Sequence, residues 1–434
     1  MTSIVDIARE CEFRFEVAPN ENFNIKLKSG SAEIFGVELA IDNEYTFRDQ
    51  KVAVYTWYGC TLETQGVADV AYTSDETPMN SYINLHAQLQ RRRELARVTP
   101  DARGPRVLVT GPADSGKSTL TQILMNYALR RDENPTLVDL DPSQGWLSIP
   151  GTISATPLDI NCLSVEESFV LTSCLSYWHA HALIADNPEL YRHHVNQLAA
   201  AVKQRLANDS KADASGLIID TSSWIDGPGY ELLLLAIQVF RVDVIVVIGQ
   251  DRLFSRLQSS QEIASSSISI IKLVRSGGVV PFNIKQRAGK RMNEIREYFY
   301  GRQSLSNGIS QLAPCINHYS FDDLDLFAIQ EFKVSDVMLP VGQTEAEFQR
   351  LQVVPIEKSI KLLNSIAAVC HEAAQQPEAQ ESQGDHTMLL DTCAAGFVCI
   401  REIHMEEKKI VLLVPSPGPL PSRKLLLGSI KWME

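Results

Sequence analysis

Residues 107–120 read VLVTGPADSGKSTL, and this stretch constrains the fold more than any other part of the chain. Gly111, Gly116, Lys117 and Ser118 fit the pattern GxxxxGK[ST], between a strand-like apolar run and a helix-like run. In that context the glycines let the backbone N–H groups face phosphates, and the helix N-terminus adds partial positive charge. We expect Lys117 to reach the β- and γ-phosphates of a nucleotide and Ser118 to offer its hydroxyl to Mg²⁺.

Apolar runs and helical stretches alternate on both sides of this phosphate loop. The runs RVLVTG, PTLVDLD, SGLIID and VDVIVVIG are typical of buried strands, and the residues between them have helical periodicity. This alternation indicates βα units around a parallel sheet. A length of 434 residues suggests about three domains at roughly 150 residues each.

The flanking segments have different patterns. Apolar and polar residues alternate from about 12 to 73, which predicts an antiparallel β domain, and a helix follows before the break at Gly104 and Pro105. After Gly301 we expect a helix near 354–372, a flexible polar loop at 373–387, and strands at 396–420. The predicted fold class is α/β: a central P-loop domain (96–302) between an N-terminal β domain (1–95) and a small C-terminal α+β or β-rich domain (303–434).

Composition excludes several classes of protein. The eight cysteines are scattered without a CxxC pair, as expected for reduced thiols in the cytosol or nucleus. No basic, apolar leader and no run of about 18 apolar residues is present, so we expect neither secretion nor a membrane span. The net charge of −13 argues against non-specific coating of nucleic acid, but leaves room for a local basic groove.

Carboxylates end two of the predicted strands. Asp139 and Asp141 close PTLVDLD, and Asp220 closes SGLIID. Period two places Asp139 and Asp141 on the same side of the strand, and Gln144 completes a DxDxxQ spacing. One carboxylate of the pair is suited to orient metal-bound water and the other to accept a proton. Solvated strand ends are the alternative explanation, and the residues alone leave open which aspartate dominates at a metal.

A basic segment favours a kinase over a GTPase. A GTPase would carry an NKxD motif directly after a strand to recognise guanine. The nearest similar sequence, residues 210–213, precedes the apolar run SGLIID instead. Residues 281–302 carry a local charge of +4, and Arg287 and Arg291 share a helix face, as in a lid that closes on a transferred phosphoryl group. A solvated charged helix is the alternative. The basic residues of this segment are Lys285, Arg287, Lys290, Arg291, Arg296 and Arg302.

The chain resembles the RNA 5′-hydroxyl kinase family, whose members are subunits of the pre-mRNA 3′-end cleavage machinery and, in animals, associate with the tRNA splicing endonuclease. The resemblance spans nearly the whole chain, through RFEV, AEIFGVEL, KVAVYTWYGC, VAYTSDETPM, GPRVLVTGPADSGKSTL, DLDPSQGWLSIPGT, VDVIVVI, SGGVV and IREYFYG. It implies a nuclear, ATP- and Mg²⁺-dependent kinase that phosphorylates single-stranded or duplex RNA 5′ ends, with those complexes as partners.

The resemblance also implies roles for individual residues. Glu12 and Lys51 match nucleotide contacts of the N-terminal domain, where the residues alone indicate ordinary exposed charges. Asp141 matches the carboxylate that activates the RNA 5′-hydroxyl. Asp139 matches a metal-site position that is Asp or Glu in relatives. Gln144 lies beside these two on the substrate side. Arg287 and Arg291 fall in the family's lid. Trp224 matches an aromatic clamp for the terminal base, with a core tryptophan as the alternative. The ATP-binding stretch is Asp114, Ser115, Gly116, Lys117, Ser118 and Thr119.

Some positions depart from the family pattern. Ser115 and the pair Pro142 and Ser143 replace residues that are often Val and Val-Gly, and the first half of the lid is divergent. Because some members have lost activity, an ATP-bound scaffold is the alternative function, and a small-molecule kinase is a third. Intact Lys117, Ser118 and Asp141 favour an enzyme. The helix at 90–97, QRRRELAR, looks exposed and suits either docking or a solvated basic face.

Overall fold

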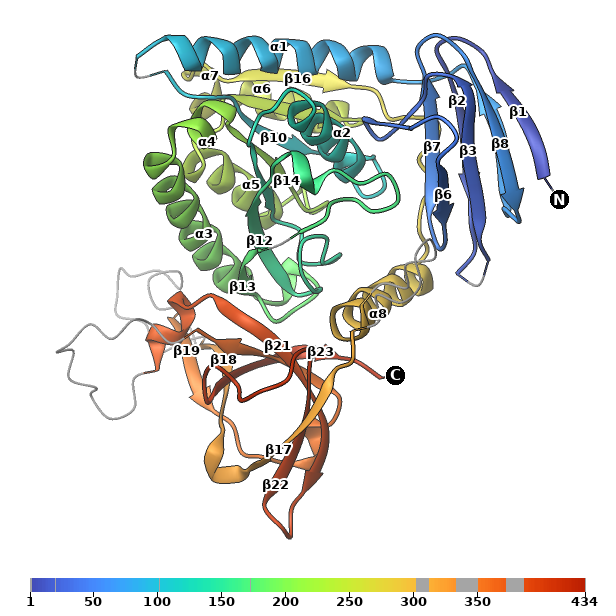
Figure 1. Cartoon of the computed structure of the whole chain (residues 1–434). Coiled ribbons are helices and arrows are strands. Elements are labelled where there is room, and N and C mark those ends of the chain that lie inside the picture. Colours follow the sequence, from blue (N-terminus) through green and yellow to red (C-terminus); the bar gives the residue numbers. More distant parts are fainter. Residues whose placement is uncertain are drawn as a thin grey trace.

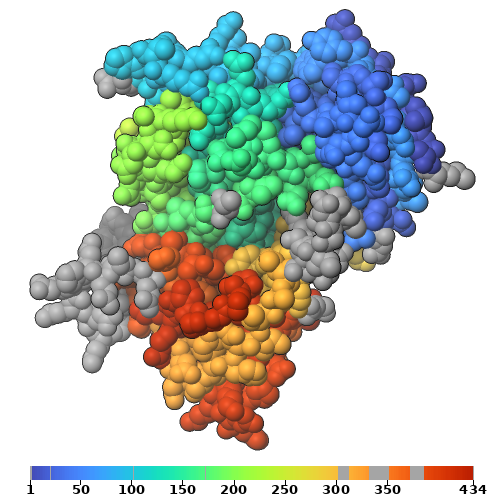
Figure 2. Space-filling model, viewed as in Figure 1, coloured from blue at the N-terminus to red at the C-terminus, as the bar shows by residue number. Residues whose placement is uncertain are grey.

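The computed structural model describes residues 2–19, 21–100, 102–171, 173–301, 312–332, 350–371 and 386–433. An N-terminal β sandwich lies beside a central α/β unit, and a C-terminal sheet packs below the central unit (Figure 1). The space-filling view shows the three in contact (Figure 2). In the described residues, no helix is both long and apolar enough to cross a bilayer.

The N-terminal domain consists of two antiparallel sheets with an aromatic core between them. Their strand orders are β1-β8-β3-β6 and β5-β4-β7-β2-β9. Phe15 is fully buried, with ring centroids 4.8 Å from Phe23 and 5.4 Å from Phe47. The predicted β domain is confirmed. Its strands are β1 (Thr2–Ile7), β2 (Cys11–Glu16), β3 (Phe23–Gly30), β4 (Glu33–Ile34), β5 (Val37–Glu38), β6 (Glu44–Phe47), β7 (Lys51–Thr56), β8 (Cys60–Gly66) and β9 (Val70–Ser74).

The central sheet has the order β13-β12-β11-β14-β10-β15-β16. The run from β11 to β16 is parallel, and β12 and β13 are antiparallel. The four apolar runs of the sequence form four of the parallel strands, as predicted. The strands are β10 (Arg106–Thr110), β11 (Thr136–Asp139), β12 (Thr152–Pro157), β13 (Leu175–Trp178), β14 (Leu217–Asp220), β15 (Val244–Ile248) and β16 (Ser269–Leu273).

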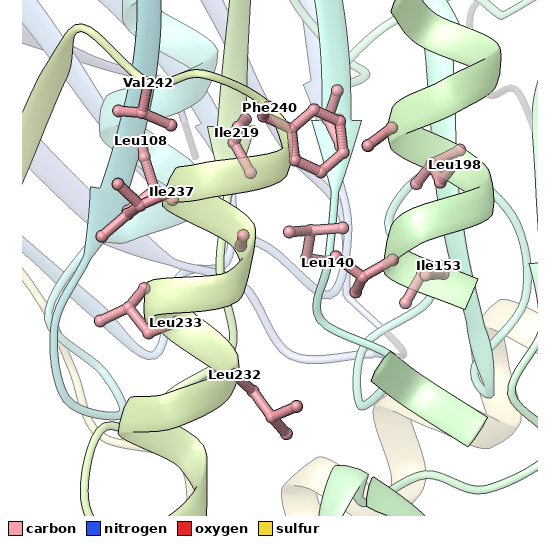
Figure 3. Close-up of a cluster of buried hydrophobic side chains, with 14 of the residues drawn as sticks. Leu108, Leu140, Ile153, Leu198, Ile219, Leu232, Leu233, Ile237, Phe240 and Val242 are labelled. Carbon is pink, nitrogen blue, oxygen red and sulfur yellow. The ribbon is translucent and has the colours of Figure 1, made fainter. Parts of the chain in front are cut away.

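Helices cover both faces of this sheet, because successive strand residues point to opposite sides. Val107 and Val109 pack with α1 and α2, whereas Leu108 packs with α3 and α5 (Figure 3). The helices are α1 (Met79–Val98), α2 (Lys117–Leu129), α3 (Pro188–Asn208), α4 (Ser210–Ser215), α5 (Pro228–Val239), α6 (Asp251–Ser259) and α7 (Gln261–Ala264), with 3₁₀ turns η1 (Ile160–Cys162) and η2 (Ile184–Asp186).

Helix α1 is less exposed than its sequence suggests. Arg93 is 1% exposed and donates from Nε to the backbone oxygen of Ser215 at 2.9 Å. Gln90 is also buried and donates to Glu133 at 2.7 Å. The interpretation of residues 90–97 as a wholly exposed basic helix is therefore wrong, since part of its polar side faces a buried carboxylate.

The C-terminal sheet has the order β17-β22-β21-β20-β23-β18-β19. The helix predicted near 354–372 is wrong, because most of that stretch forms β19, a 3₁₀ turn and β20. All six residues of β20 are buried, so its sequence SIAAVC lacks the alternation that marks a half-exposed strand. Most of the loop predicted at 373–387 lies outside the described residues. The elements are β17 (Cys315–Ser320), η3 (Phe321–Asp323), β18 (Asp325–Phe332), β19 (Arg350–Pro355), η5 (Ile360–Leu362), β20 (Ser365–Cys370), η6 (Thr387–Asp391), β21 (Ala394–His404), β22 (Lys409–Val414) and β23 (Lys424–Lys431).

Helix α8 (Ile284–Tyr300) lies between the N-terminal sandwich and the C-terminal sheet (Figure 1). A capping box starts it: the Asn283 side chain accepts from the Gln286 N–H, and the Gln286 side chain accepts from the Asn283 N–H. The helix ends at Gly301, with φ +75°. This is the helix that carries the predicted lid arginines.

Candidate active site

The phosphate loop connects β10, at the centre of the parallel sheet, to α2. Gly116 adopts φ +91° at the N-cap of α2, a conformation that favours glycine. A side chain at Gly111 would bring its Cβ to 2.7 Å from the backbone oxygen of Ile248. Both glycines are therefore required by the shape of the loop, which leaves the N-terminus of α2 directed at its concave side.

Lys117 and Ser118 occupy the first turn of α2. Lys117 is buried, and its Nζ donates to the backbone oxygen of Pro112 at 3.0 Å, so the ammonium folds back over the loop. The Ser118 hydroxyl donates to Asp220 Oδ2 at 2.5 Å. Of the neighbouring loop residues, Ser115 is buried and Thr119 is exposed.

Three buried carboxylates lie at the carboxyl edge of the sheet beside this loop. Asp139 and Asp220 are in register on the neighbouring parallel strands β11 and β14. Asp141 follows β11, and its backbone N–H donates to Asp139 Oδ1 at 2.9 Å. The Asp141 carboxylate accepts from the Ser143 N–H at 3.0 Å and from the Gln144 amide at 3.4 Å. The structure thus brings Asp139, Asp141 and Gln144 together, as the DxDxxQ spacing suggests.

Two of these carboxylates have raised pKa values. Burial raises the pKa of Asp139 well above its ordinary value, and the charges of Asp220 and Asp141 raise it further. Burial also raises the pKa of Asp220 to about 6, although Lys117 and the Ser118 hydroxyl oppose this shift. Asp220 Oδ1 is buried and has no hydrogen-bond partner among the described residues. Oxygen ligands with unsatisfied negative charge are the donor set that fits a divalent cation such as Mg²⁺.

The lid helix reaches the phosphate loop through its first turn. Arg287 Nη2 donates to Asp114 Oδ2 at 2.5 Å, and the Phe282 N–H donates to the same oxygen at 3.3 Å. Arg291, one turn further along α8, is partly exposed and forms no ion pair with a described residue. Arg302 lies outside the described residues. The structure therefore brings Arg287 to the loop, and Arg291 follows one turn later on the same helix.

The N-terminal domain contributes two of the predicted residues. Glu12 is 5% exposed, pairs with Arg14 at 2.7 Å and accepts a hydrogen bond from the Thr77 hydroxyl. An ordinary exposed charge is therefore the wrong description of Glu12. Lys51 pairs with Glu16 at 3.0 Å, and its ammonium lies 4.7 Å from the centre of the Phe282 ring at the start of the lid.

Trp224 lies in the segment between β14 and α5. The ring is partly buried against the core and lines a cavity of about 20 Å³ with Leu140 and Tyr191. That cavity is too small for a nucleobase, so a stacked base would need the outer face of the ring. The ring therefore packs partly against the core, and its role as a clamp for the terminal base stays a prediction.

The sequence did not predict the contact between Asp114 and Arg287, and it left the role of Asp220 undecided. The Asp114 contact with Arg287 joins residues 173 positions apart, and no local pattern announces such a contact. For Asp220, the strand-end position was a signal, but its bond to Ser118 depends on how β14 inserts beside β10.

Comparisons with known proteins assign the chain to a family. Three family models match: the N-terminal β-sandwich domain of polyadenylation factor (6–96), the mRNA cleavage and polyadenylation factor CLP1 P-loop (111–301), and the pre-mRNA cleavage complex II protein Clp1 (312–434). A "Protein CLP1 homolog" from Arabidopsis thaliana is 41% identical and covers 99% of this chain and 94% of its own. The chain belongs to the Clp1 family.

Other Clp1 relatives match over the full length. "Polyribonucleotide 5'-hydroxyl-kinase Clp1" from Homo sapiens is 35% identical over 100% of this chain and 97% of its own. The solved structure of a wild-type Clp1p–Pcf11p complex superposes with a TM-score of 0.81 at 25% identity, covering 100% of this chain and 99% of that one. A second solved structure superposes with a TM-score of 0.82. It concerns an extended interface between Pcf11p and Clp1p and the loss of ATP in a glycine-to-arginine mutant. The resemblance read from the sequence is confirmed, and a nucleotide-binding P-loop follows from the family.

Proposed function

We propose that this Clp1 family member is an ATP-dependent polyribonucleotide 5′-hydroxyl kinase of mRNA 3′-end processing. The observation that carries the proposal is the group of three buried carboxylates beside Lys117 and Ser118, in a chain whose relatives bear that enzyme name. A site that only held ATP would have no need of Asp141 as a proton acceptor. The lid arginine at the loop supports phosphoryl transfer for the same reason.

The donor nucleotide would occupy the phosphate loop. Residues 114–119 supply backbone N–H groups and the Lys117 ammonium to the phosphates, and Arg287 and Arg291 approach from the lid. Mg²⁺ bound to the triphosphate would neutralise charge that develops on the transferred group, and Ser118, Asp139 and Asp220 are the residues suited to hold it. Glu12 and Lys51 lie on the N-terminal side, where we place the rest of the nucleotide.

The acceptor would be the 5′-hydroxyl of an RNA strand. Asp141 is held by the Ser143 N–H and the Gln144 amide, and it is the carboxylate suited to orient that hydroxyl and accept its proton. Trp224 offers its outer face to the terminal base, which gives sequence-tolerant binding. We also propose three kinds of partner: RNA ends, cleavage-complex subunits like the Pcf11p of the structural relatives, and the tRNA splicing endonuclease. The proposed location is the nucleus.

Transfer of the γ-phosphate from labelled ATP to a short 5′-hydroxyl RNA tests the proposal, beside DNA of the same length. We expect Lys117→Ala and Asp141→Asn each to lower transfer at least about a hundredfold without changing the circular dichroism spectrum. Near-normal transfer in either variant contradicts the mechanism. No transfer by the wild type, with ATP retained through purification, favours the scaffold alternative.

A further inference from the structure

Helix α8 is held firmly at its C-terminal end. Ile295 and Phe299 are fully buried, and Phe299 stacks on Trp432 with ring centroids 5.4 Å apart and planes 12° apart. The Tyr298 hydroxyl accepts a hydrogen bond from the Phe397 N–H at 2.9 Å. The C-terminal domain therefore fixes where this end of the helix lies.

The N-terminal end of α8 has little apolar anchorage. Ile284 is 86% exposed, and a Cβ on Gly289 would meet nothing within 4 Å. Its polar tie to the phosphate loop is the Asp114 carboxylate, which accepts from both Arg287 and the Phe282 N–H. The contacts with Asp114 therefore hold this end of the helix against the loop.

The negative charge of Asp114 in a phosphate-binding loop requires a physical explanation. Asp114 belongs to the loop that is built to hold phosphates, so its negative charge opposes the ligand unless a cation neutralises it. Arg287 supplies that cation, and their side chains are 35% and 16% exposed for Arg287 and Asp114. The contact uses Nη2, and a guanidinium has five N–H donors, so others remain for a phosphate.

The same contact gathers further cations. The Phe282 backbone bonds to Asp114, while its ring lies 4.7 Å from the Lys51 ammonium and 6.0 Å from that of Lys290. The Phe282 ring, held by this backbone contact, therefore lies close to the ammonium groups of Lys51 and Lys290.

We propose that Asp114 is a positioning residue: it anchors the lid on the phosphate loop and aims Arg287 at the phosphates bound there. The expected effect of Asp114 on catalysis rests on the proposed kinase function. Its expected effect on nucleotide retention does not. Asp114 acts through Arg287 and contacts no transferred atom.

Asp114→Asn tests the anchor, because asparagine keeps the size of the side chain and tolerates the φ of +53° but removes the charge. We expect kcat to fall about tenfold and a fluorescent ATP analogue to dissociate about tenfold faster, as for loss of one charge-assisted hydrogen bond. In an Arg287→Ala background, the same change should alter kcat less than about twofold, since residues acting as one unit are not additive.

Asp132→Asn is the matched control, because Asp132 also has a positive φ (+57°) and pairs with Lys211 at 3.5 Å, outside the site. It should leave kcat and nucleotide dissociation unchanged. Unchanged dissociation in Asp114→Asn, or full additivity with Arg287→Ala, overturns the anchor. If the wild type transfers no phosphate but Asp114→Asn still speeds dissociation, the kinase proposal fails and the anchor stands.

Discussion

At the residue scale, the site concentrates negative charge that the fold itself disfavours. Asp139 and Asp220 lie in register on adjacent strands, almost without solvent, and burial together with the charge of Asp220 raises the pKa of Asp139. Such a pair of buried carboxylates lowers the stability of the metal-free protein. It is retained at sites where a bound cation compensates the negative charge. The stability of the free protein therefore reports on the metal site.

Asp220→Asn should stabilise the nucleotide-free protein while abolishing Mg²⁺-dependent transfer. The folded pKa of about 6 exceeds the ordinary 3.8, so the folded state disfavours the ionised aspartate. The advantage of asparagine should be absent below about pH 4, grow as pH rises to about 6 and then level off, at about 3 kcal/mol. Thermal unfolding at a series of pH values measures it, and a loss of Tm at pH 7.5 would contradict the assignment.

At the scale of elements, α1 is joined to the central domain by a buried polar network. Glu133 is completely buried and accepts from Gln90, from Arg97 at 2.5 Å and from Ser215 at 3.0 Å. Burial lowers the pKa of nearby Arg93 to about 10, while the charge of Glu133 raises it. The network joins the buried side of α1 to the central domain, while Arg91 and Arg92 remain exposed on the other side.

Glu133→Gln should lower the free energy of unfolding by about 2–4 kcal/mol, because it leaves a buried guanidinium without its counter-charge. Glu94→Gln, on α1, removes an exposed ion pair with Arg131 at 3.8 Å and should cost less than about 0.5 kcal/mol. Urea unfolding compares the two. Equal effects would mean that the network contributes no more than a surface pair.

What could be predicted follows the range of the interactions. The loop, its strand and its helix are consecutive in sequence, so Gly116, Lys117 and Ser118 were predictable, and so was the spacing of Asp139 and Asp141. The anchor on Asp114 and the bond to Asp220 depend on tertiary contacts that local pattern does not encode. The stretch from 354 to 372 was mistaken for a helix because a strand buried on both faces shows no alternation.

At the scale of the whole molecule, all three domains reach the neighbourhood of the loop. The N-terminal domain packs on α2, where the Tyr127 hydroxyl donates to the buried Glu33 and the Asn126 amide to the backbone oxygen of Phe35 at 2.9 Å. The C-terminal domain holds the far end of α8 through Trp432. The geometry of the site is therefore shared among domains.

Trp432→Ala should lower the free energy of unfolding by about 3–5 kcal/mol and speed nucleotide dissociation, because it removes the stacking partner of Phe299. The ring also carries the guanidinium of Arg401 at 4.5 Å. Met433→Ala is the control, since that side chain is 75% exposed. Dissociation at the wild-type rate in Trp432→Ala would show that the C-terminal domain does not support the lid.

The strand order of the central sheet has a consequence for synthesis on the ribosome. β10 pairs with β14 and β15, so Ser118 meets Asp220, and Gly111 meets Ile248, only after more than a hundred further residues have emerged. The β sandwich, complete by Ser74, is free to fold long before that. A nascent chain should therefore carry a finished first domain while it remains unable to retain nucleotide, and it gains that ability only once β15 has left the exit tunnel.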